Sequence, residues 1–522
     1  MRALLPRLGL LVALLPAPSI ASAQANAAGR YDPPSAAVRR AAASISVDYV
    51  RQGVHTIAHD SMLGRDTPSR GLDLTSAFIA SEFRKAGLRP GGPNGSWEQR
   101  YPLFLTTTVI DRSRVEFTMQ GGPTLSFSFA SNALRRFGGA TPATTGTVVM
   151  IAGPADTVAL ATVPTRGKVV VWAAPMPTGG NPPAVQSVIG SLTRGGAAAL
   201  VLVSNRTDPA GFARSVAAQA RPSVSRDSVT TQTGGLLVLE IPESAITEQF
   251  AEAGAQLAAA RQSPAFIAQD MPEWTGTVEL QRRTTRSSAP NTVGILEGTD
   301  PVLKNEYVVF SAHMDHVGTG GTPADSIFNG ADDDASGTIG IVALARAFAQ
   351  PGARPKRSMI FVTVSGEEKG LWGSAYFAAN PPVPVGQMVA NINMDMIGRN
   401  WTDTVVVIGK EHSDLGETLN AVTRAHPELG MATIDDLWPE QRFYQRSDHF
   451  NFARKGVPIL FFFNGTHADY HRASDSPDKI DYEKLSRIAQ LGFYLGTEVA
   501  NRATRPKWNQ ESYDRFVEKT VP

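Results

Sequence analysis

Short apolar runs alternate with segments of helical periodicity from about residue 279 onward. The runs are short enough for buried strands and cover residues 307–312, 359–364, 389–394, 405–408 and 458–463. The periodic segments predict helices over residues 336–349, 371–379, 415–425 and 482–499. Apolar strands separated by helices are typical of a covered, mainly parallel sheet. We therefore expect an α/β fold, with a mixed, mostly parallel central sheet flanked by helices.

Two other regions differ from this pattern. Near the N-terminus, residues 44–62 and 71–86 have helical spacing. The middle of the chain instead has strand-like runs separated by Gly, Ala and Pro, at residues 147–151, 168–173, 199–203 and 236–241. Few side chains in this middle region could do chemistry. We expect it to be an inserted, smaller, β-rich α+β domain over residues 133–272. Residues 24–132 and 273–505 would then form the main domain, followed by a C-terminal tail at 506–522.

The first 23 residues predict a signal peptide. Arg2 and Arg7 precede an apolar run at residues 8–15, and the small residues 21–23 follow. The run is too short and too interrupted by proline for an uncleaved membrane anchor, so we expect cleavage before Gln24. No later segment has eighteen continuous apolar residues, so stable membrane insertion is not expected. The chain is predicted to be exported, to the periplasm or the medium.

Charge and cysteine content narrow the possible functions. The net charge of +1 provides no general attraction for nucleic acid, which we do not expect as a partner. The sequence contains no cysteine, so cysteine nucleophiles and thiolate metal sites are excluded. Any metal site must use imidazole, carboxylate or other oxygen ligands. The oligomeric state cannot be predicted from these features.

Five residues in separate motifs are typical metal ligands. They are His313, Asp333, Glu368, Asp395 and His471. Four of them lie just beyond a predicted strand, at the edge of an α/β sheet where ligands bind. Two imidazoles and three carboxylates suit zinc, with manganese or cobalt as substitutes. Five ligands exceed what one tetrahedral zinc needs, but they fit two zinc ions that share a carboxylate.

Two neighbouring carboxylates suggest metal-assisted hydrolysis. Asp315, two residues beyond His313, could accept a hydrogen bond from its imidazole. Glu367, beside Glu368, could take a proton from a metal-bound water and pass it to a leaving amine. Taken singly, each residue could be a helix cap, a surface charge or a core histidine. Their joint occurrence at strand ends favours the metal site.

Three motifs together resemble a known enzyme family. The strings G-A-D-D-D-A-S-G, S-G-E-E-K-G-L-W-G-S and N-M-D-M-I-G-R resemble the dizinc exopeptidases, which include bacterial leucyl aminopeptidase, aminopeptidase Y, glutamate carboxypeptidase and glutaminyl cyclase. The resemblance covers about residues 45–130 and 280–500. The middle region looks like the protease-associated domain that is often inserted in this family.

The resemblance implies a role for each residue. His313 and Asp395 would bind one zinc, Glu368 and His471 the other, and Asp333 would bridge them, although Asp332 remains possible from the spacing. Glu367 would be the general base and Asp315 would orient His313. The family's cis peptide bond would fall at Asp333–Asp334. Further substrate contacts would come from Tyr444, Tyr470, Met396 and Phe443.

The resemblance implies an exported, zinc-dependent aminopeptidase that acts on peptides. A carboxypeptidase is the alternative, because Arg442 and Arg446 flank Tyr444 and could bind a substrate carboxylate. A glutaminyl cyclase is disfavoured by the inserted domain, and an inactive binding scaffold by the intact ligand set. Motifs of zincins, serine hydrolases and P-loop enzymes do not occur in the sequence.

Overall fold

The computed structural model describes residues 31, 33–173, 183–227, 235–322 and 324–519. The predicted signal peptide therefore lies outside the described residues. The chain divides into two compact units: a catalytic unit, Met1–Arg100 with Pro290–Pro522, and an inserted unit, Tyr101–Ala289. Every predicted ligand belongs to the catalytic unit.

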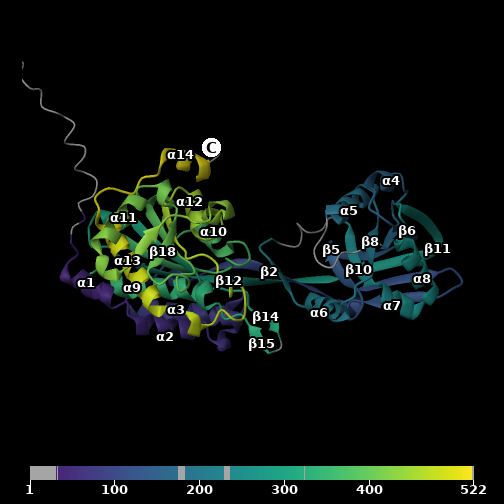
Figure 1. Ribbon diagram of the computed structural model, residues 1–522, viewed down its shortest axis with the longest axis horizontal. Coiled ribbons are helices and arrows are strands. Elements are labelled where there is room, and N and C mark those ends of the chain that lie inside the picture. Colours follow the sequence, from purple (N-terminus) through teal and green to yellow (C-terminus); the bar gives the residue numbers. More distant parts are fainter. Residues whose placement is uncertain (1–30, 32, 174–182, 228–234, 323, 520–522) are drawn as a thin grey trace, which may run out of the picture. The chain divides into compact units, whose positions relative to one another are not determined.

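The catalytic unit is built on a mixed sheet (Figure 1). Within this unit the strand order is β19-β18-β20-β17-β13-β16-β12, and β1 pairs with β12. Strand β9 and most of β2 belong by their residues to the inserted unit. The four central strands, β20, β17, β13 and β16, are mutually parallel, as the near-continuous apolar runs predicted. The strand bounds are β1 Arg89–Pro90, β2 Glu98–Thr108, β9 Ser223–Ser225, β12 Arg282–Leu296, β13 Tyr307–His313, β16 Ser358–Val364, β17 Met388–Met394, β18 Thr404–Ile408, β19 Ala432–Ile434 and β20 Ile459–Phe462.

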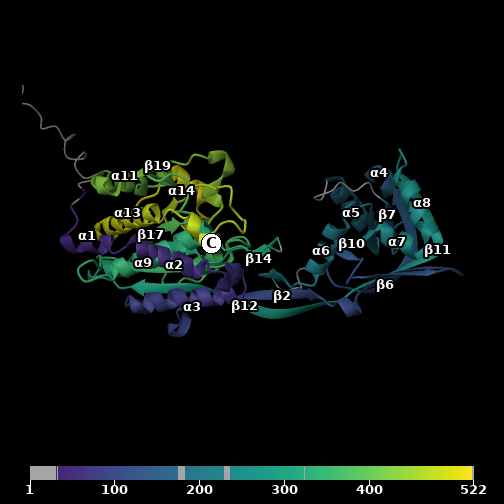
Figure 2. The same ribbon diagram turned by 60° about the horizontal axis from the view of Figure 1, so that its bottom comes forward.

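Helices cover both faces of this sheet. On one face α9 and α13 run side by side in both views, with α2 packed against them (Figures 1 and 2). On the other face α10 and α12 pack together. The helices are α1 Ala36–Ala43, α2 Val47–Ile57, α3 Arg70–Lys85, α9 Gly337–Phe348, α10 Trp372–Ala379, α11 Leu415–Ala425, α12 His449–Arg454, α13 Tyr482–Asn501 and α14 Gln510–Phe516. None of the described helices is long and apolar enough to cross a membrane.

Strand β13 shows how packing of the core orients a predicted metal ligand. Val308 and Phe310 face α9 and α13, and the Phe310 ring packs between those of Phe348 and Phe361. Successive strand residues alternate between the faces of a sheet, so Val309 and the final residue His313 lie on the opposite side. Burial of the apolar residues thereby fixes where the imidazole points.

The inserted unit has its own sheet, in the order β4-β3-β11-β6-β7-β8-β10-β5. Strands β6, β7, β8 and β10 are parallel, and the others pair antiparallel. The strands are β3 Arg114–Met119, β4 Thr124–Ser128, β5 Leu134–Phe137, β6 Thr141–Ala152, β7 Val169–Ala173, β8 Ala199–Ser204, β10 Leu237–Pro242 and β11 Ile267–Leu280. The helices are α4 Thr157–Ala161, α5 Pro183–Gly195, α6 Pro209–Gln219, α7 Glu243–Gln249 and α8 Ala251–Arg261.

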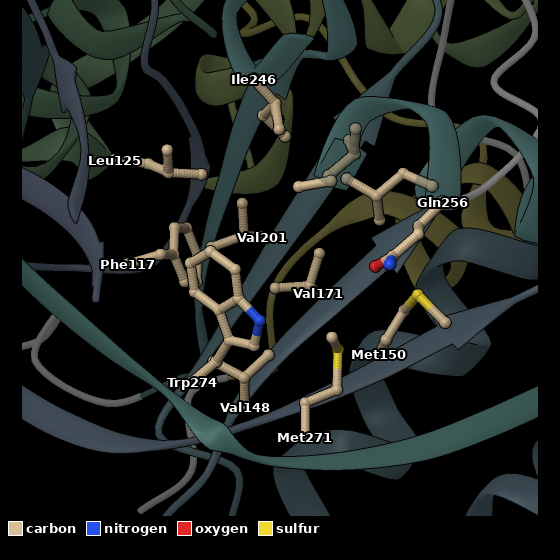
Figure 3. A pocket seen from close by; sticks show the side chains of 13 residues that line it. Phe117, Leu125, Val148, Met150, Val171, Val201, Ile246, Gln256, Met271 and Trp274 are labelled. Atoms are coloured by element: carbon tan, nitrogen blue, oxygen red, sulfur yellow. The ribbon is translucent and has the colours of Figure 1, made fainter. Parts of the chain in front are cut away.

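A cavity of about 70 Å³ lies in the core of the inserted unit (Figure 3). Its lining is almost wholly apolar and includes Phe117, Met150, Val201 and Trp274, with Gln256 as the one polar side chain. No titratable group lines the cavity, which is therefore a gap in core packing and not part of the predicted metal site.

The observed boundaries of the two units differ from those expected. The inserted unit begins at Tyr101 rather than 133, because β3 pairs with β11 and β11 pairs with β6. It ends at Ala289 rather than 272, within the long strand β12. Residues 506–522 were expected to form a C-terminal tail. In their described part, Phe516 of α14 packs against Tyr444 and His412.

Helix α13 can approach the sheet because Gly496 has no side chain. A Cβ at this position would lie 2.5 Å from the Phe310 ring and 3.0 Å from that of Phe348. We expect Gly496→Ala to destabilise the protein by about 1–3 kcal/mol through overpacking, despite its gain in helix propensity. Gly386→Ala is the control, because no atom lies within 4 Å of its added Cβ. Thermal unfolding should show a lower midpoint for Gly496→Ala alone, and equal midpoints would contradict the packing argument.

Candidate metal centre

The parallel strands bring four of the five predicted ligands to one edge of the sheet. His313 ends β13, and Asp395 directly follows β17. Glu368 follows β16, and His471 lies in the loop after β20. Because these strands are parallel, their carboxyl ends coincide. Asp333 reaches the same place from the helical turn Ala331–Ser336 that precedes α9.

The carboxylate of Asp333 lies between two groups of ligands. Its Oδ1 is 3.2 Å from Nε2 of His313, and that nitrogen is 3.5 Å from Oδ1 of Asp395. Its Oδ2 is 3.1 Å from Nε2 of His471, and that nitrogen is 3.0 Å from Oε2 of Glu368. The structure therefore brings all five residues together, in the two groups that the resemblance implied.

These separations fit a tetrahedral metal ion. Ligand atoms about 2.0–2.1 Å from a tetrahedral ion lie about 3.3 Å from each other, and the four distances within the two ligand groups are 3.0–3.5 Å. Oδ2 of Asp333, Oδ1 of Asp395 and Nε2 of His471 are also buried without a hydrogen-bond partner. Buried polar atoms of this kind need a partner, and a cation in each group would satisfy them.

His316 is a member of this cluster that the sequence analysis did not assign. Its Nδ1 is 2.8 Å from Oε1 of Glu368, and its Nε2 is buried without a partner. His316, Asp333 and Glu368 could together hold a cation. The signal was present in the motif S-A-H-M-D-H, where the second imidazole follows the first by three residues.

The structure separates the three aspartates of the acidic triplet. Asp332 accepts a 2.6 Å hydrogen bond from the Gly398 amide and faces His467 at 3.3 Å, away from the ligand groups. Asp334 accepts hydrogen bonds from the backbone N–H groups of His313, Gly337 and Met396. Only Asp333 lies between the two groups. The Asp333–Asp334 peptide bond is cis, as the resemblance implied.

Two residues outside the predicted set hold the ligands in place. The carboxylate of Asp475 accepts hydrogen bonds from the amides of Asp332 and Asp333 at 3.1 Å. Ser447 donates a 2.9 Å hydrogen bond to Oδ2 of Asp395, leaving Oδ1 open. Asp475 follows His471 by four residues and Ser447 follows Tyr444 by three, but their contacts with the ligand residues arise only in the folded chain.

Asp315 contacts His313 differently from the expectation. Nδ1 of His313 lies 3.2 Å from the backbone carbonyl of Asp315 and 3.7 Å from its carboxylate. The carboxylate instead accepts hydrogen bonds from the Thr67 hydroxyl and the Glu367 amide. Asp315 can thus orient the imidazole through its main chain while its side chain fixes the loop that carries Glu367.

Glu367 lines a small cavity beside the two ligand groups. The cavity, about 40 Å³, is also lined by His313, Asp333 and Asp395. Burial raises the pKa of the Glu367 carboxyl well above its ordinary value, and the nearby His313 opposes this shift. A carboxyl group whose pKa is raised in this way can act in turn as a proton acceptor and a proton donor.

Three of the four predicted substrate contacts line the same cavity. Met396, Phe443 and Tyr470 form part of its wall, and the Tyr470 ring stacks on His471. Tyr444 lies elsewhere, with its ring against His412 and Phe516. The left-handed residue Arg442 and the short turn after it send the neighbouring side chains of Phe443 and Tyr444 in different directions. The sequence spacing of Tyr444 could not show this.

Comparison with known proteins agrees with the site. Residues 291–495 match the model of Peptidase family M28. This segment is therefore similar to family M28. The expected kinship with zinc-dependent peptidases is thereby confirmed for the segment that carries all five predicted ligands.

The chain also has sequence relatives. A probable zinc metalloprotease of Pyricularia oryzae is 30% identical over 253 residues, 40% of this chain and 50% of the relative. A probable leucine aminopeptidase of Arthroderma benhamiae is 26% identical over 217 residues, 38% of this chain and 56% of the relative. The chain thus spans about half the length of these relatives.

The fold is also found in a solved structure. An aminopeptidase from Aneurinibacillus sp. strain AM-1 covers 90% of this chain, with 97% of its own length, at 16% identity and a TM-score of 0.51. At this identity the similarity concerns the fold alone. It confirms the expected α/β class with a mixed sheet flanked by helices.

Substitution of two neighbouring aspartates should distinguish a bridging ligand from a supporting residue. We expect Asp333→Asn to lower zinc affinity more than about 100-fold and to lower the zinc occupancy of both metal positions, because Asp333 contacts both ligand groups. Asp332→Asn should lower affinity by about 10- to 100-fold at most and keep both ions at saturating zinc. Elemental analysis and chelator competition would measure this. A larger loss of zinc affinity in Asp332→Asn than in Asp333→Asn would show that Asp332, and not Asp333, is the bridging ligand.

Zinc binding should release protons at pH 7. Although burial opposes it, the neighbouring carboxylates of Asp333 and Glu368 raise the pKa of the free His471 imidazole to about 10. The surrounding carboxylates likewise raise the pKa of His313 well above its ordinary value. Both imidazoles must lose a proton to bind a metal, so apparent zinc affinity should rise with pH between 6 and 8. Calorimetry in buffers of different ionisation enthalpy measures the released protons, and pH-independent affinity would contradict this assignment.

Proposed function

We propose that this protein is an exopeptidase, specifically an aminopeptidase, that hydrolyses peptides at a site for two zinc ions. The observation that carries the proposal is the position of the Asp333 carboxylate, with one oxygen near His313 and the other near His471. His313 and Asp395 would hold one ion, and Glu368 and His471 the other. Metal ions in such a site polarise the carbonyl group and acidify a water molecule.

The protein's own residues would move the proton. Glu367 would take a proton from the attacking water as the water oxygen adds to the carbonyl carbon of the peptide bond. It would then give this proton to the leaving amine nitrogen as the C–N bond breaks. The 3.3 Å hydrogen bond from its amide to Asp315 fixes the loop that places Glu367 in the cavity.

The wall of the cavity supports an apolar terminal residue. Met396, Phe443, Phe461 and Phe463 contribute apolar surface to the lining of the cavity. One residue favours a second candidate function, a carboxypeptidase. Arg446 lines the cavity and could pair with a substrate carboxylate. Dipeptides blocked at the N-terminus or at the C-terminus would separate the two functions, because an aminopeptidase requires the free amine.

Removing the proposed base should separate metal binding from turnover. We expect Glu367→Gln to keep its zinc and to lose about 10²–10⁴-fold in kcat on Leu-p-nitroanilide, because the amide cannot accept the proton. Glu440→Gln is the matched control, because Glu440 is exposed and outside the cavity. Zinc content by elemental analysis and steady-state kinetics on the same samples measure both properties.

Two outcomes would contradict the proposal. A zinc-replete Glu367→Gln variant with unchanged kcat would remove the base from its role. Wild-type protein that keeps its activity after dialysis against a chelator, with no metal detected, would remove the metal-assisted reaction altogether. Loss of activity with the chelator and recovery with two zinc ions per chain are the expected results.

A further inference from the structure

Two tryptophans lie beside the cavity at the same edge of the sheet. Trp401 lies in the loop that leaves β17 after Asp395 and enters β18. Trp438 lies in the loop that leads to Phe443 in the cavity wall. Strand β18 runs antiparallel to β20, so its first residues lie at the carboxyl end of β20, where the ligand loops gather.

Aromatic contacts connect these tryptophans to the cavity. Phe443 and Phe463 line the cavity with ring centroids 4.8 Å apart. The ring of Trp438 meets both edge-on, at 5.8 Å and 6.0 Å. Trp401 then stacks on Trp438 at 6.4 Å. The four rings form a continuous row from the cavity wall to the surface.

The outer end of this row is exposed. Trp401 is 41% exposed, and Leu437, next to Trp438 in the sequence, is 49% exposed; they are two of the eight large apolar side chains that are exposed, at 38% or more, in the described residues. Single exposed apolar residues are ordinary, but a group that adjoins a binding cavity marks a contact surface. We call Trp401, Leu437 and Trp438 the aromatic strip.

The loops around the strip are held in place. The Asn400 side chain donates a 2.6 Å hydrogen bond to the carbonyl of Asn464, which ties the loop of Trp401 to the loop after β20. The neighbouring Gly465 leaves room for the indole of Trp438, because a Cβ there would lie 2.4 Å from the ring. Trp438 is therefore fixed before a ligand arrives, which lowers the entropy cost of binding.

We propose that the aromatic strip binds the side chain of the third residue of a peptide whose first side chain occupies the cavity. In an extended peptide, side chains one and three point to the same side and lie about 7 Å apart. The Trp438 ring lies 5.8 Å from the Phe443 ring in the cavity wall, within this spacing, and Trp401 extends the aromatic surface outward from Trp438. Peptides with an aromatic or large apolar third residue would bind best. This inference rests on the proposed function and adds its substrate class.

Peptide binding without cleavage tests the strip. The Glu367→Gln protein, loaded with zinc, is titrated with Leu-Gly-Phe and Leu-Gly-Gly by calorimetry. We expect Leu-Gly-Phe to bind about three- to tenfold more tightly, the range of one aromatic contact. Adding Trp401→Ala should bring the two dissociation constants within twofold of each other. Tyr513→Ala is the matched control, because Tyr513 is an aromatic residue 42% exposed in α14, outside the strip, and it should keep the preference.

Three results would overturn the assignment. Equal affinities of the Glu367→Gln protein for Leu-Gly-Phe and Leu-Gly-Gly would show that the protein does not bind the third side chain. A preference that survives Trp401→Ala would place the contact elsewhere. A preference for Phe-Gly-Gly over Leu-Gly-Gly that disappears with Trp401→Ala would assign the strip to the first residue.

Failure of the proposed function has a different signature. In that case zinc-loaded wild-type protein hydrolyses neither Leu-p-nitroanilide nor the tripeptides. The ratio of the two dissociation constants in Glu367→Gln would still be measured, because it does not depend on turnover. If neither tripeptide binds, the strip assignment fails as well.

Discussion

The concentration of buried carboxylates around Asp333 is the constraint on which the catalytic unit depends. Asp333, Asp395 and Glu368 approach two imidazoles to within 3.0–3.5 Å, with several polar atoms left without partners. Buried charge of one sign is costly unless it is paired or binds a cation. Much of the surrounding structure can be understood as holding these groups in place.

The N-terminal segment has a large part in this support. The Arg65 side chain is fully buried and donates hydrogen bonds to the carbonyls of Ile57, Met314, Asn329 and Gly330. Burial lowers the pKa of its guanidinium, but the carboxylates of the site, Asp333 foremost, favour the charged form. The adjacent Thr67 hydroxyl donates to Asp315 and accepts from the Gly366 amide. One short segment therefore ties together the loops after β13 and β16.

The inserted unit contrasts with this arrangement. Its core is apolar and its cavity is lined by no titratable group. Its one buried carboxylate with two arginine partners, Glu240 beside Arg136 and Arg206, is an ion pair within its own fold. All five predicted metal ligands lie in the catalytic unit, and the residues of the aromatic strip belong to the same unit.

An element could be predicted from the sequence where residues close together in the chain determine it. The central strands and the helices α9, α11 and α13 fall close to their predicted ranges, because continuous apolar runs and helical periodicity reflect burial directly. Strands β2 and β12 and the limits of the insert were missed. Their polar, exposed stretches take their conformation from pairing partners far away in the sequence, which no local pattern encodes.

The same distinction holds for the site. The sequence by itself determined which residues can bind metal, because imidazole and carboxylate groups at strand ends carry that chemistry wherever the chain folds them. Only the tertiary structure decided that Asp333 rather than Asp332 lies between the ligand groups, that His316 joins them, and that Tyr444 turns away. Neighbouring residues share almost the same sequence context. Backbone direction and hydrogen bonds from distant segments, such as those to Asp475 and Gly398, select which side chain faces the cavity.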